Sequence, residues 1–280
     1  ACPHHAPDQI PLRSIMIRIN HVTKIFNRGG VNEVVALNDC SLYVEKGDFV
    51  TLIGSNGAGK SSLLNALAGT YPVEGGEIIL NGRDVTRWPE FRRAKYIGRV
   101  FQDPLVGTSA SLTIEQNLAM AMKRGQRRGF ALGVKAAYRN RFREDLRILG
   151  LGLEDRLGTT VGLLSGGQRQ ALTMLMSTLV RPEVLLLDEH TAALDPKTAR
   201  QILGLTREII DSRRLTALMV THNMKHALEF GNRLIMMHRG RIILDIAEEE
   251  KTQTSVDHLL ERFYSQQGED FSSDRGLLVD

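Results

Sequence analysis

The strongest constraint on this sequence is the run GSNGAGKSS, from Gly54 to Ser62. The apolar segment FVTLI before it predicts a buried central strand, and LLNALAGT after it predicts a helix that ends at Gly69. In this context the spacing GxxxxGK[ST] is typical of a phosphate-binding loop, whose glycines let successive backbone N–H groups point inward at the start of a helix. A glycine-rich turn alone does not explain a lysine and a hydroxyl at that spacing.

The motif predicts a role for each of its residues. Lys60 is expected to reach the β- and γ-phosphates of a nucleotide, and Ser61 to place its hydroxyl on Mg²⁺. The other expected phosphate contacts are Gly54, Ser55, Asn56, Gly57, Ala58, Gly59 and Ser62.

A second feature is the run VLLLDE at residues 184–189, which reads as an apolar strand with two carboxylates at its C-terminal end. Open α/β sheets bind ligands at that end of their strands. Asp188 is expected to hold Mg²⁺ through its water shell, and Glu189 to orient or deprotonate an attacking water. Burying both carboxylates for structure alone would be costly, because each would need its own partners. Phosphoryl transfer needs positioning and charge stabilisation, which these groups supply.

The rest of the chain alternates between strand-like and helix-like segments. The pattern IRINHVTKIF after Met16 predicts a strand, and GGEIILNGRDV predicts a hairpin-like edge that turns at Asn81-Gly82. A helix is expected at about 197–213, with the strand TALMVTH after it. This alternation implies a mostly parallel sheet and an α/β fold of the P-loop NTPase type.

The expected domain organisation is a disordered lead-in over residues 1–15, one nucleotide-binding domain over 16–265 and a flexible tail over 266–280. Within the domain, about 103–165 is rich in helix-forming residues, so a helical subdomain is expected there.

Composition limits the classes of partner. The 280 residues carry a formal charge of +4, with basic residues gathered at 87–99 and 123–143. A solvated helical face explains the second cluster best, followed by anionic lipid headgroups or a partner protein, with nucleic acid last.

Cys2 and Cys40 have the spacing of neither a disulfide framework nor a zinc site. No run of 18 apolar residues is present, so any service to a membrane is expected to go through another protein.

The segment LSGGQ, Leu164 to Gln168, resembles the signature of the ABC transporter ATPases. Four further segments match motifs of that family in the right order. Gln102 in VFQDP resembles its Q-loop glutamine, Ala193-Leu194-Asp195 its D-loop, His222 in VTHN its switch histidine, and Phe26 its adenine-stacking aromatic. The resemblance implies an ABC-type ATPase core with an antiparallel β edge and a helical subdomain.

The resemblance also implies a homodimer, packed head to tail with ATP at the interface. Ser165 and Gly167 of one copy would contact the γ-phosphate held by the other, with Gly166, Gln168 and Asp195 beside them. His222 would steady the γ-phosphate, and Gln102 would bind the metal and link it to the helical subdomain.

Plainer interpretations of three of these residues stay open. Ser165 could be only a helix N-cap, Phe26 a buried aromatic at a strand end, and His222 a satisfied core histidine.

His190 departs from the family, which usually has proline after the catalytic glutamate. Its imidazole could tune the basicity of Glu189, or the residue could merely continue the backbone turn, which is the favoured interpretation.

The segments LLLDEHTAALDP, residues 185–196, and THNMKHALEFGNRLIMMHRGRII, residues 221–243, resemble a bacterial, uptake-type subgroup of the family. That subgroup is related to tryptophan/tyrosine and branched-chain amino-acid transport ATPases. The leading hypothesis is therefore the ATP-hydrolysing subunit of an importer of amino acids or similar small solutes. It would work with separate transmembrane permease subunits and a solute-binding protein, on the cytoplasmic, inner face of the cell membrane.

Three other classes of protein share some of these features. An exporter subunit would carry the same motifs. A nucleic-acid or ribosome-associated ATPase is disfavoured because about 110 residues separate Gly54 from Ser165, too few for a long coiled coil, and no zinc cysteines are present. No binding of nucleic acid is expected. A non-hydrolysing regulatory module would need a degenerate site, whereas Lys60, Asp188 and Glu189 are all in place.

Overall fold

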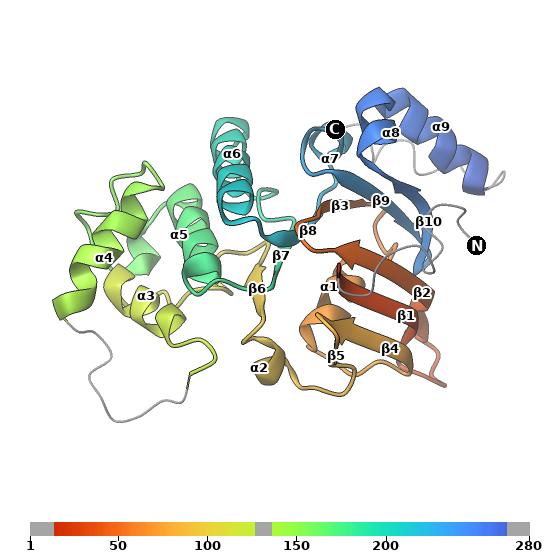
Figure 1. Cartoon of the computed structure of the whole chain (residues 1–280), viewed down its shortest axis with the longest axis horizontal. Coiled ribbons are helices and arrows are strands. Elements are labelled where there is room, and N and C mark those ends of the chain that lie inside the picture. The colour runs from red at the N-terminus through yellow and green to blue at the C-terminus, as the bar shows by residue number, and fades with distance from the viewer. Residues whose placement is uncertain (1–13, 127–135, 268–280) are drawn as a thin grey trace. The chain divides into compact units, whose positions relative to one another are not determined.

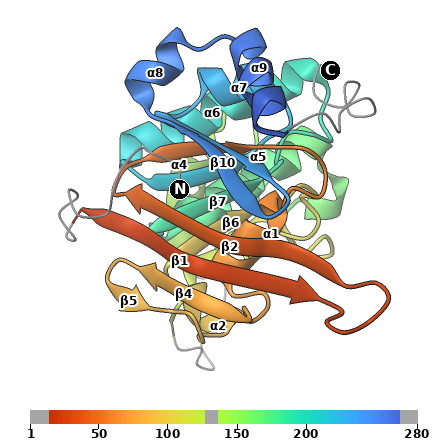
Figure 2. The same ribbon diagram turned by 90° about the vertical axis from the view of Figure 1, so that its right-hand side faces the viewer.

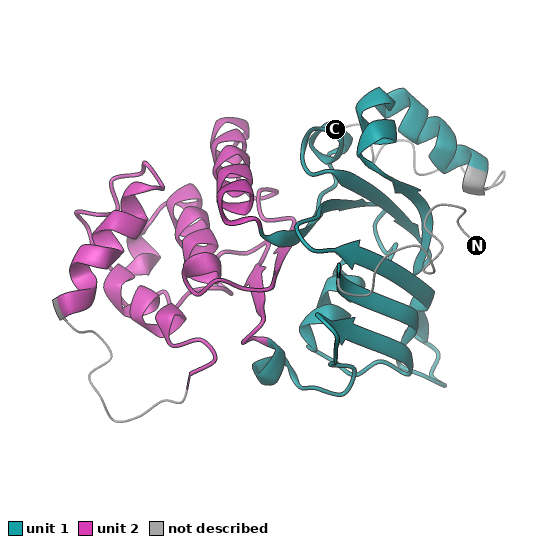
Figure 3. Cartoon of the chain, in the orientation of Figure 1, with its two compact units in different colours: residues 1–93, 215–280 teal, residues 94–214 magenta. Residues whose placement is uncertain are grey.

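A computed structural model of the chain describes residues 14–126 and 136–267. It divides the chain into two compact units, unit 1 with residues 1–93 and 215–280 and unit 2 with residues 94–214 (Figure 3). Residues 1–13 of the predicted lead-in, most of the predicted tail, Cys2 and the basic residues Arg127, Arg128 and Lys135 lie outside the described residues. The predicted lead-in runs to residue 15, but Ile15 is already buried in a strand. None of the described helices is both long enough and apolar enough to cross a membrane.

Unit 1 contains the predicted antiparallel edge, a sheet of order β2-β1-β4-β5 whose strands face the viewer in Figure 2. Its strands are β1 (Ile15–Phe26), β2 (Val34–Glu45), β4 (Gly75–Leu80) and β5 (Arg83–Asp84). Asn81 and Gly82 have φ of +47° and +76°, the left-handed pair that a two-residue hairpin turn requires. The predicted hairpin is thus confirmed, and β1 begins one residue before Met16.

The parallel strands of unit 1 are β3 (Phe49–Ile53), β8 (Thr216–Val220) and β9 (Arg233–His238), with β3 between the other two. Strand β10 (Arg241–Ile246) runs antiparallel beside β9. All residues of β3 and β8 are buried, as their continuous apolar runs predict.

The helices of unit 1 are α1 (Lys60–Ala68), α2 (Glu90–Arg93), α7 (Met224–Glu229), α8 (Glu248–Gln253) and α9 (Val256–Gln267). Leu259 and Phe263 of α9 pack with Leu234 and Met236 of β9 in one buried cluster. Because α9 continues to Gln267, ordered structure extends two residues past the predicted boundary at 265.

Unit 2 has two parallel strands, β6 (Ile97–Val100) and β7 (Val184–Asp188), and four α-helices among its described residues (Figure 1). The helices are α3 (Ile114–Met122), α4 (Ala136–Arg147), α5 (Gly166–Leu179) and α6 (Pro196–Arg213), with a short 3-10 helix at Val161–Leu163. The region 103–165 therefore does hold helices. The predicted helix at about 197–213 is α6, which starts at Pro196.

Much of the second basic cluster is taken up by contacts inside unit 2. Arg124 donates to the backbone carbonyls of Ser177 and Val180. Arg139 binds Glu115 through two hydrogen bonds of 2.7 and 3.1 Å. Arg141 pairs with Asp145 one helical turn away, at 3.6 Å. The described part of the cluster thus fits a helical surface paired with its own carboxylates and carbonyls.

A buried arginine caps the helix that follows the phosphate loop. Arg93, only 2% exposed, donates from Nη1 to the carbonyls of Ala66 and Leu67 at 2.7 and 2.9 Å. These carbonyls belong to the last turn of α1, where intrahelical donors are few. The Ala66 carbonyl also accepts the Gly69 N–H, at 3.3 Å. The same guanidinium reaches the carbonyls of Trp88 and Thr86. Burial lowers the pKa of Arg93 to about 10, which leaves it charged at neutral pH.

Replacing Arg93 should therefore destabilise unit 1. We expect Arg93→Met to cost at least about 2 kcal/mol in the free energy of unfolding, since each buried carbonyl left unpaired costs about 1–3 kcal/mol. The matched control is Arg92→Met, because Arg92 is exposed and lies against the Trp88 ring, 3.9 Å from its centroid. That change should cost about 1 kcal/mol or less. Urea unfolding of both variants measures the difference, and equal losses would contradict the capping role.

Candidate functional site

The predicted phosphate loop lies at the C-terminal end of β3 and curls as its glycines predict. Gly54, Gly57 and Gly59 have φ of +145°, +75° and +101°. A Cβ on Gly54 would lie 2.2 Å from the Met237 carbonyl oxygen, and one on Gly59 would lie 2.5 Å from that of Ala36. The loop thus needs glycine at these positions for both backbone angle and space.

The lysine of this loop is folded into its concave side. Lys60 is 5% exposed, and its Nζ donates to the carbonyls of Gly54 and Ser55 at 2.8 and 3.0 Å. An ammonium held in this way lies among backbone groups at the positive start of α1, a setting that suits an anionic phosphate. Ser61 next to it is exposed.

His222 lies at the same edge of the parallel strands as the phosphate loop. Strand β8 runs parallel to β3, with Val220 opposite Leu52, and the Thr221 N–H donates to the Leu52 carbonyl at 3.2 Å. His222 follows directly and is half-buried. Unit 1 therefore brings this predicted residue to the strand end that carries Lys60.

Phe26 ends β1 and is half-buried against a second aromatic. Its ring meets that of Tyr71 edge-on, with the ring centres 5.2 Å apart, and the Tyr71 hydroxyl donates to the Ser62 carbonyl in α1. Lys24 places its Nζ 5.2 Å from the centre of the Phe26 ring and pairs with Glu74 at 2.8 Å. Phe26 is thus tied to the helix after the phosphate loop.

In unit 2, the two predicted carboxylates follow β7 as the sequence indicates. Asp188 and Glu189 are both half-buried, and Glu189 has φ of +46°, which is unusual for a residue with a side chain. Arg99 of β6 lies 3.6 Å from the Asp188 carboxylate, and its guanidinium covers the Phe101 ring at 4.5 Å. Arg99 was not among the predicted site residues, although a charged side chain in the buried run IGRV was a signal for it.

Gln102 lies at the same edge of unit 2 as the two carboxylates. Strand β6 is parallel to β7, with Val100 opposite Leu187, so the segments that follow both strands start side by side. Gln102 is exposed, and the buried Gln170 of α5 holds the preceding Phe101 carbonyl at 3.2 Å.

The signature segment, Leu164–Gln168, forms the start of α5. Ser165 is the N-cap, its Oγ accepting the Gln168 N–H while the Gln168 side chain accepts the Ser165 N–H, both at 3.3 Å. The N-cap interpretation is therefore confirmed. It leaves a phosphate contact possible, because the hydroxyl keeps its own proton and the N–H groups of Gly166 and Gly167 have no intrahelical acceptor.

The D-loop residue Asp195 lies close to the signature segment within unit 2. Asp195 is the N-cap of α6 and accepts the Thr198 N–H at 3.0 Å, and its hydrogen bonds with Thr198 lower its pKa. A Cβ on Gly167 would lie 2.3 Å from the Thr198 side chain, so α5 and α6 approach closely where both begin.

The buried His190 ring contacts helix α6. The residue is 2% exposed, and its Nε2 lies 3.1 Å from the Thr206 hydroxyl in α6. Burial lowers the pKa of His190 to about 4, so the ring is neutral near pH 7. The interpretation that His190 tunes Glu189 directly is therefore disfavoured.

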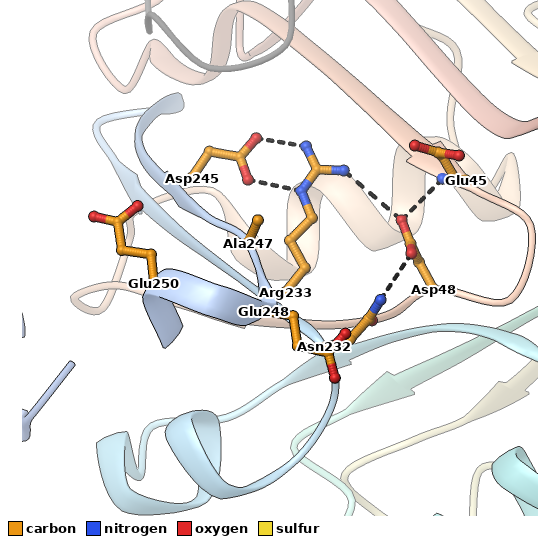
Figure 4. Close-up of a pocket in the computed structure, with 8 residues that line it drawn as sticks. All are labelled: Glu45, Asp48, Asn232, Arg233, Asp245, Ala247, Glu248 and Glu250. Carbon is orange, nitrogen blue, oxygen red and sulfur yellow. Dashed lines mark hydrogen bonds and ion pairs between the residues drawn. The ribbon is translucent and has the colours of Figure 1, made fainter. Parts of the chain in front are cut away.

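A pocket of about 230 Å³ lies at the other edge of the strands in unit 1 (Figure 4). Arg233 binds Asp245 through Nε and Nη2 at 2.7 and 2.5 Å and lies 3.9 Å from Asp48. Burial opposes the charge of Arg233, but the bonds and charges of these carboxylates raise its pKa. Asp48 precedes β3 and Arg233 begins β9, so the pocket is at the strand ends opposite the phosphate loop.

The predicted residues thus fall into two sets, one in each unit. Unit 1 holds Phe26, His222 and the loop 54–62, and unit 2 holds Gln102, Ser165 to Gln168, Asp188, Glu189 and Asp195. Ser61, Gln102 and Asp188 offer hydroxyl, amide and carboxylate oxygens, the hard donors that Mg²⁺ prefers. Within its own unit, most of each set lies at the C-terminal ends of strands or at the N-terminal ends of helices.

Comparison with known proteins identifies the class. A family model described as ABC transporter matches residues 37–192. The tyrosine transport ATP-binding protein of Clostridioides difficile is 42% identical over 251 residues, covering 89% of this chain and 98% of that protein. A sulfate/thiosulfate import ATP-binding protein of Xanthomonas campestris is 35% identical over 227 residues, 81% of this chain but 62% of that longer protein.

Among solved structures, a dimeric ATP-binding cassette in a post-hydrolysis state, bound to ADP and Pi, has a TM-score of 0.71 and 28% identity. The match covers 83% of this chain and 99% of that one. The fold is that of an ATP-binding cassette ATPase. The chain belongs to the ABC transporter family.

The phosphate loop should not tolerate a side chain at Gly59. We expect Gly59→Ala to weaken ATP binding at least about tenfold and to cost about 1–3 kcal/mol of stability, because the Cβ meets a backbone oxygen and φ is strained. The control is Gly29→Ala, since Gly29 also has positive φ but has nothing within 4 Å of the added Cβ. Titration with a fluorescent ATP analogue measures the binding. Equal affinity in the two variants would contradict the geometry described.

Proposed function

We propose that this chain is the energy-coupling subunit of a bacterial ABC importer for amino acids or similar small solutes. The observation that carries the proposal is the curled loop 54–62 with the Lys60 ammonium folded into it. The similarity to a tyrosine transport ATP-binding protein along nearly its whole length supports the substrate class.

We propose further a role in ATP binding and hydrolysis for each predicted site residue. Lys60 and the loop N–H groups would bind the β- and γ-phosphates, and Phe26 would stack on the adenine. Glu189 would accept a proton from the attacking water, while His222 would donate a hydrogen bond to the γ-phosphate. Ser61, Asp188 and Gln102 would hold Mg²⁺, which neutralises charge on the phosphate oxygens.

The second half of each site would come from another copy of the chain. Ser165 keeps a hydroxyl proton to donate, and the N–H groups of Gly166 and Gly167 lie at the positive end of the 14-residue helix α5. Both features suit a γ-phosphate presented by a partner. The dimeric cassette among the similar structures supports a head-to-tail homodimer, with Asp195 beside the signature segment of its own copy.

The transport partner would be a separate permease. Leu105, Val106 and Met120 are apolar yet 46%, 64% and 49% exposed. They lie in the segment 103–123, which we propose as part of the groove that receives a helix of the permease. Such a partner would place the chain on the inner, cytoplasmic face of the cell membrane, and an importer of this type would also use a solute-binding protein.

The Glu189 carboxylate should be required for turnover but not for binding. We expect Glu189→Gln to lower kcat by about 10²–10⁴-fold, since the amide cannot accept the proton of water, while ATP affinity stays within about threefold. The control is Glu183→Gln, because Glu183 lies just before β7 at the opposite strand end. Phosphate release and ATP titration measure the two quantities. Undiminished hydrolysis in Glu189→Gln would remove this residue from the catalytic role.

The transporter assignment is tested by what the chain binds in its host. We would express tagged Glu189→Gln, solubilise membranes with ATP and Mg²⁺ present, and identify co-purifying proteins by mass spectrometry. A polytopic permease is the expected result, and its family would distinguish import from export. Ribosomal proteins or nucleic acid would instead overturn the proposal.

A further inference from the structure

The turn that carries Glu189 is held in an unfavourable backbone conformation. Strand β7 ends at Asp188, and the next residue, Glu189, has φ of +46°. A residue with a side chain costs about 1–2 kcal/mol in the left-handed region, so surrounding contacts must fix it there. The Ala192 N–H donates to the Glu189 carbonyl at 3.0 Å, which closes the turn on one side.

The contact on the other side is the buried pair His190 and Thr206. Thr206 is 0% exposed, and its hydroxyl donates to the Ile202 carbonyl in α6 at 2.8 Å. A hydroxyl has one proton, so when that proton goes to Ile202 the hydroxyl accepts toward His190 Nε2, which lies 3.1 Å away. In this arrangement the proton of His190 is on Nε2, and the imidazole is the donor.

This bond joins the turn to the interior of a long helix. Thr206 lies in the third turn of α6, whose first turn is capped by Asp195, directly after the segment 191–194 that leaves the turn. Glu189 is thus fixed by the β7 ladder before it and by a side-chain hydrogen bond right after it. Proline at position 190 would restrain the same backbone covalently, but it would make no bond to α6.

We propose that His190 is a positioning residue, whose hydrogen bond to Thr206 fixes the turn that aims the Glu189 carboxylate at the attacking water. The inference rests on the proposed role of Glu189 as the group that accepts the proton. It predicts that the pair acts on turnover and not on nucleotide affinity, because neither side chain belongs to the phosphate loop. A histidine that merely fills space would affect stability alone.

The test uses the full chain with paired substitutions at both positions. Thr206→Val keeps the shape but removes the acceptor, whereas Thr206→Ser keeps the hydroxyl. His190→Leu removes the donor, whereas His190→Gln retains an N–H at similar reach. We expect Thr206→Val and His190→Leu to lower kcat about tenfold or more, since misplacing a catalytic group by about 1 Å can cost about 10²-fold. In contrast, Thr206→Ser and His190→Gln should keep kcat within about threefold.

The Kd for ATP should change less than about threefold in all four variants. The double variant His190→Leu/Thr206→Val should have a kcat no lower than that of the less active single variant, because both substitutions remove the same hydrogen bond. Additive losses, equal kcat in Thr206→Val and Thr206→Ser, or a lower melting temperature with unchanged kcat would each overturn the proposal. If Thr206→Val does not fold, the comparison of His190→Gln with His190→Leu decides by the same criterion. Wild type and Glu189→Gln run alongside: equal activity in these two would reject the role of Glu189 itself.

Discussion

The curl of the phosphate loop is the constraint on which the rest of unit 1 depends. Gly54 and Gly59 lie so close to backbone oxygens that no side chain fits, and the Lys60 ammonium binds carbonyls of the loop itself. Contacts from distant segments hold this arrangement: the Gly240 N–H donates to the Ala58 carbonyl at 2.9 Å, and Arg93 caps the far end of α1. Neighbouring elements thus fix a backbone shape that suits phosphate.

In unit 2, neighbouring residues likewise hold two negatively charged side chains in place. Its two carboxylates leave the end of a buried strand, where water is limited, and each position is held by a cationic or polar neighbour. Arg99 pairs with Asp188, and the bond from His190 to Thr206 restrains the turn at Glu189. Preorganised charge of this kind supplies most of what phosphoryl transfer asks of a protein.

The sequence predicted those parts of the structure that depend on neighbours in the chain. Local spacing predicts three elements: the strand–loop–helix around Lys60, the turn at Asn81-Gly82 and the start of α6. It does so because glycine, asparagine and a proline in the first turn of a helix have strong backbone preferences. Long-range pairs could not be predicted. In the sequence, Arg93 is one of several basic residues in the segment 87–99, and only the fold shows that it contacts α1. Likewise, the partner of His190 is 16 residues away on another element, so sequence alone could not choose between its possible roles.

In the proposed mechanism, ATP joins two copies of this chain through the phosphate loop of one and the signature segment of the other. Sedimentation velocity of Glu189→Gln, with and without ATP and Mg²⁺, tests it most directly. We expect a species of twice the chain mass only when ATP is present, and we expect that species to be lost when Ser165→Arg is added to the same chain. A monomer under all conditions, or a dimer that ignores both ATP and Ser165→Arg, would contradict the claim.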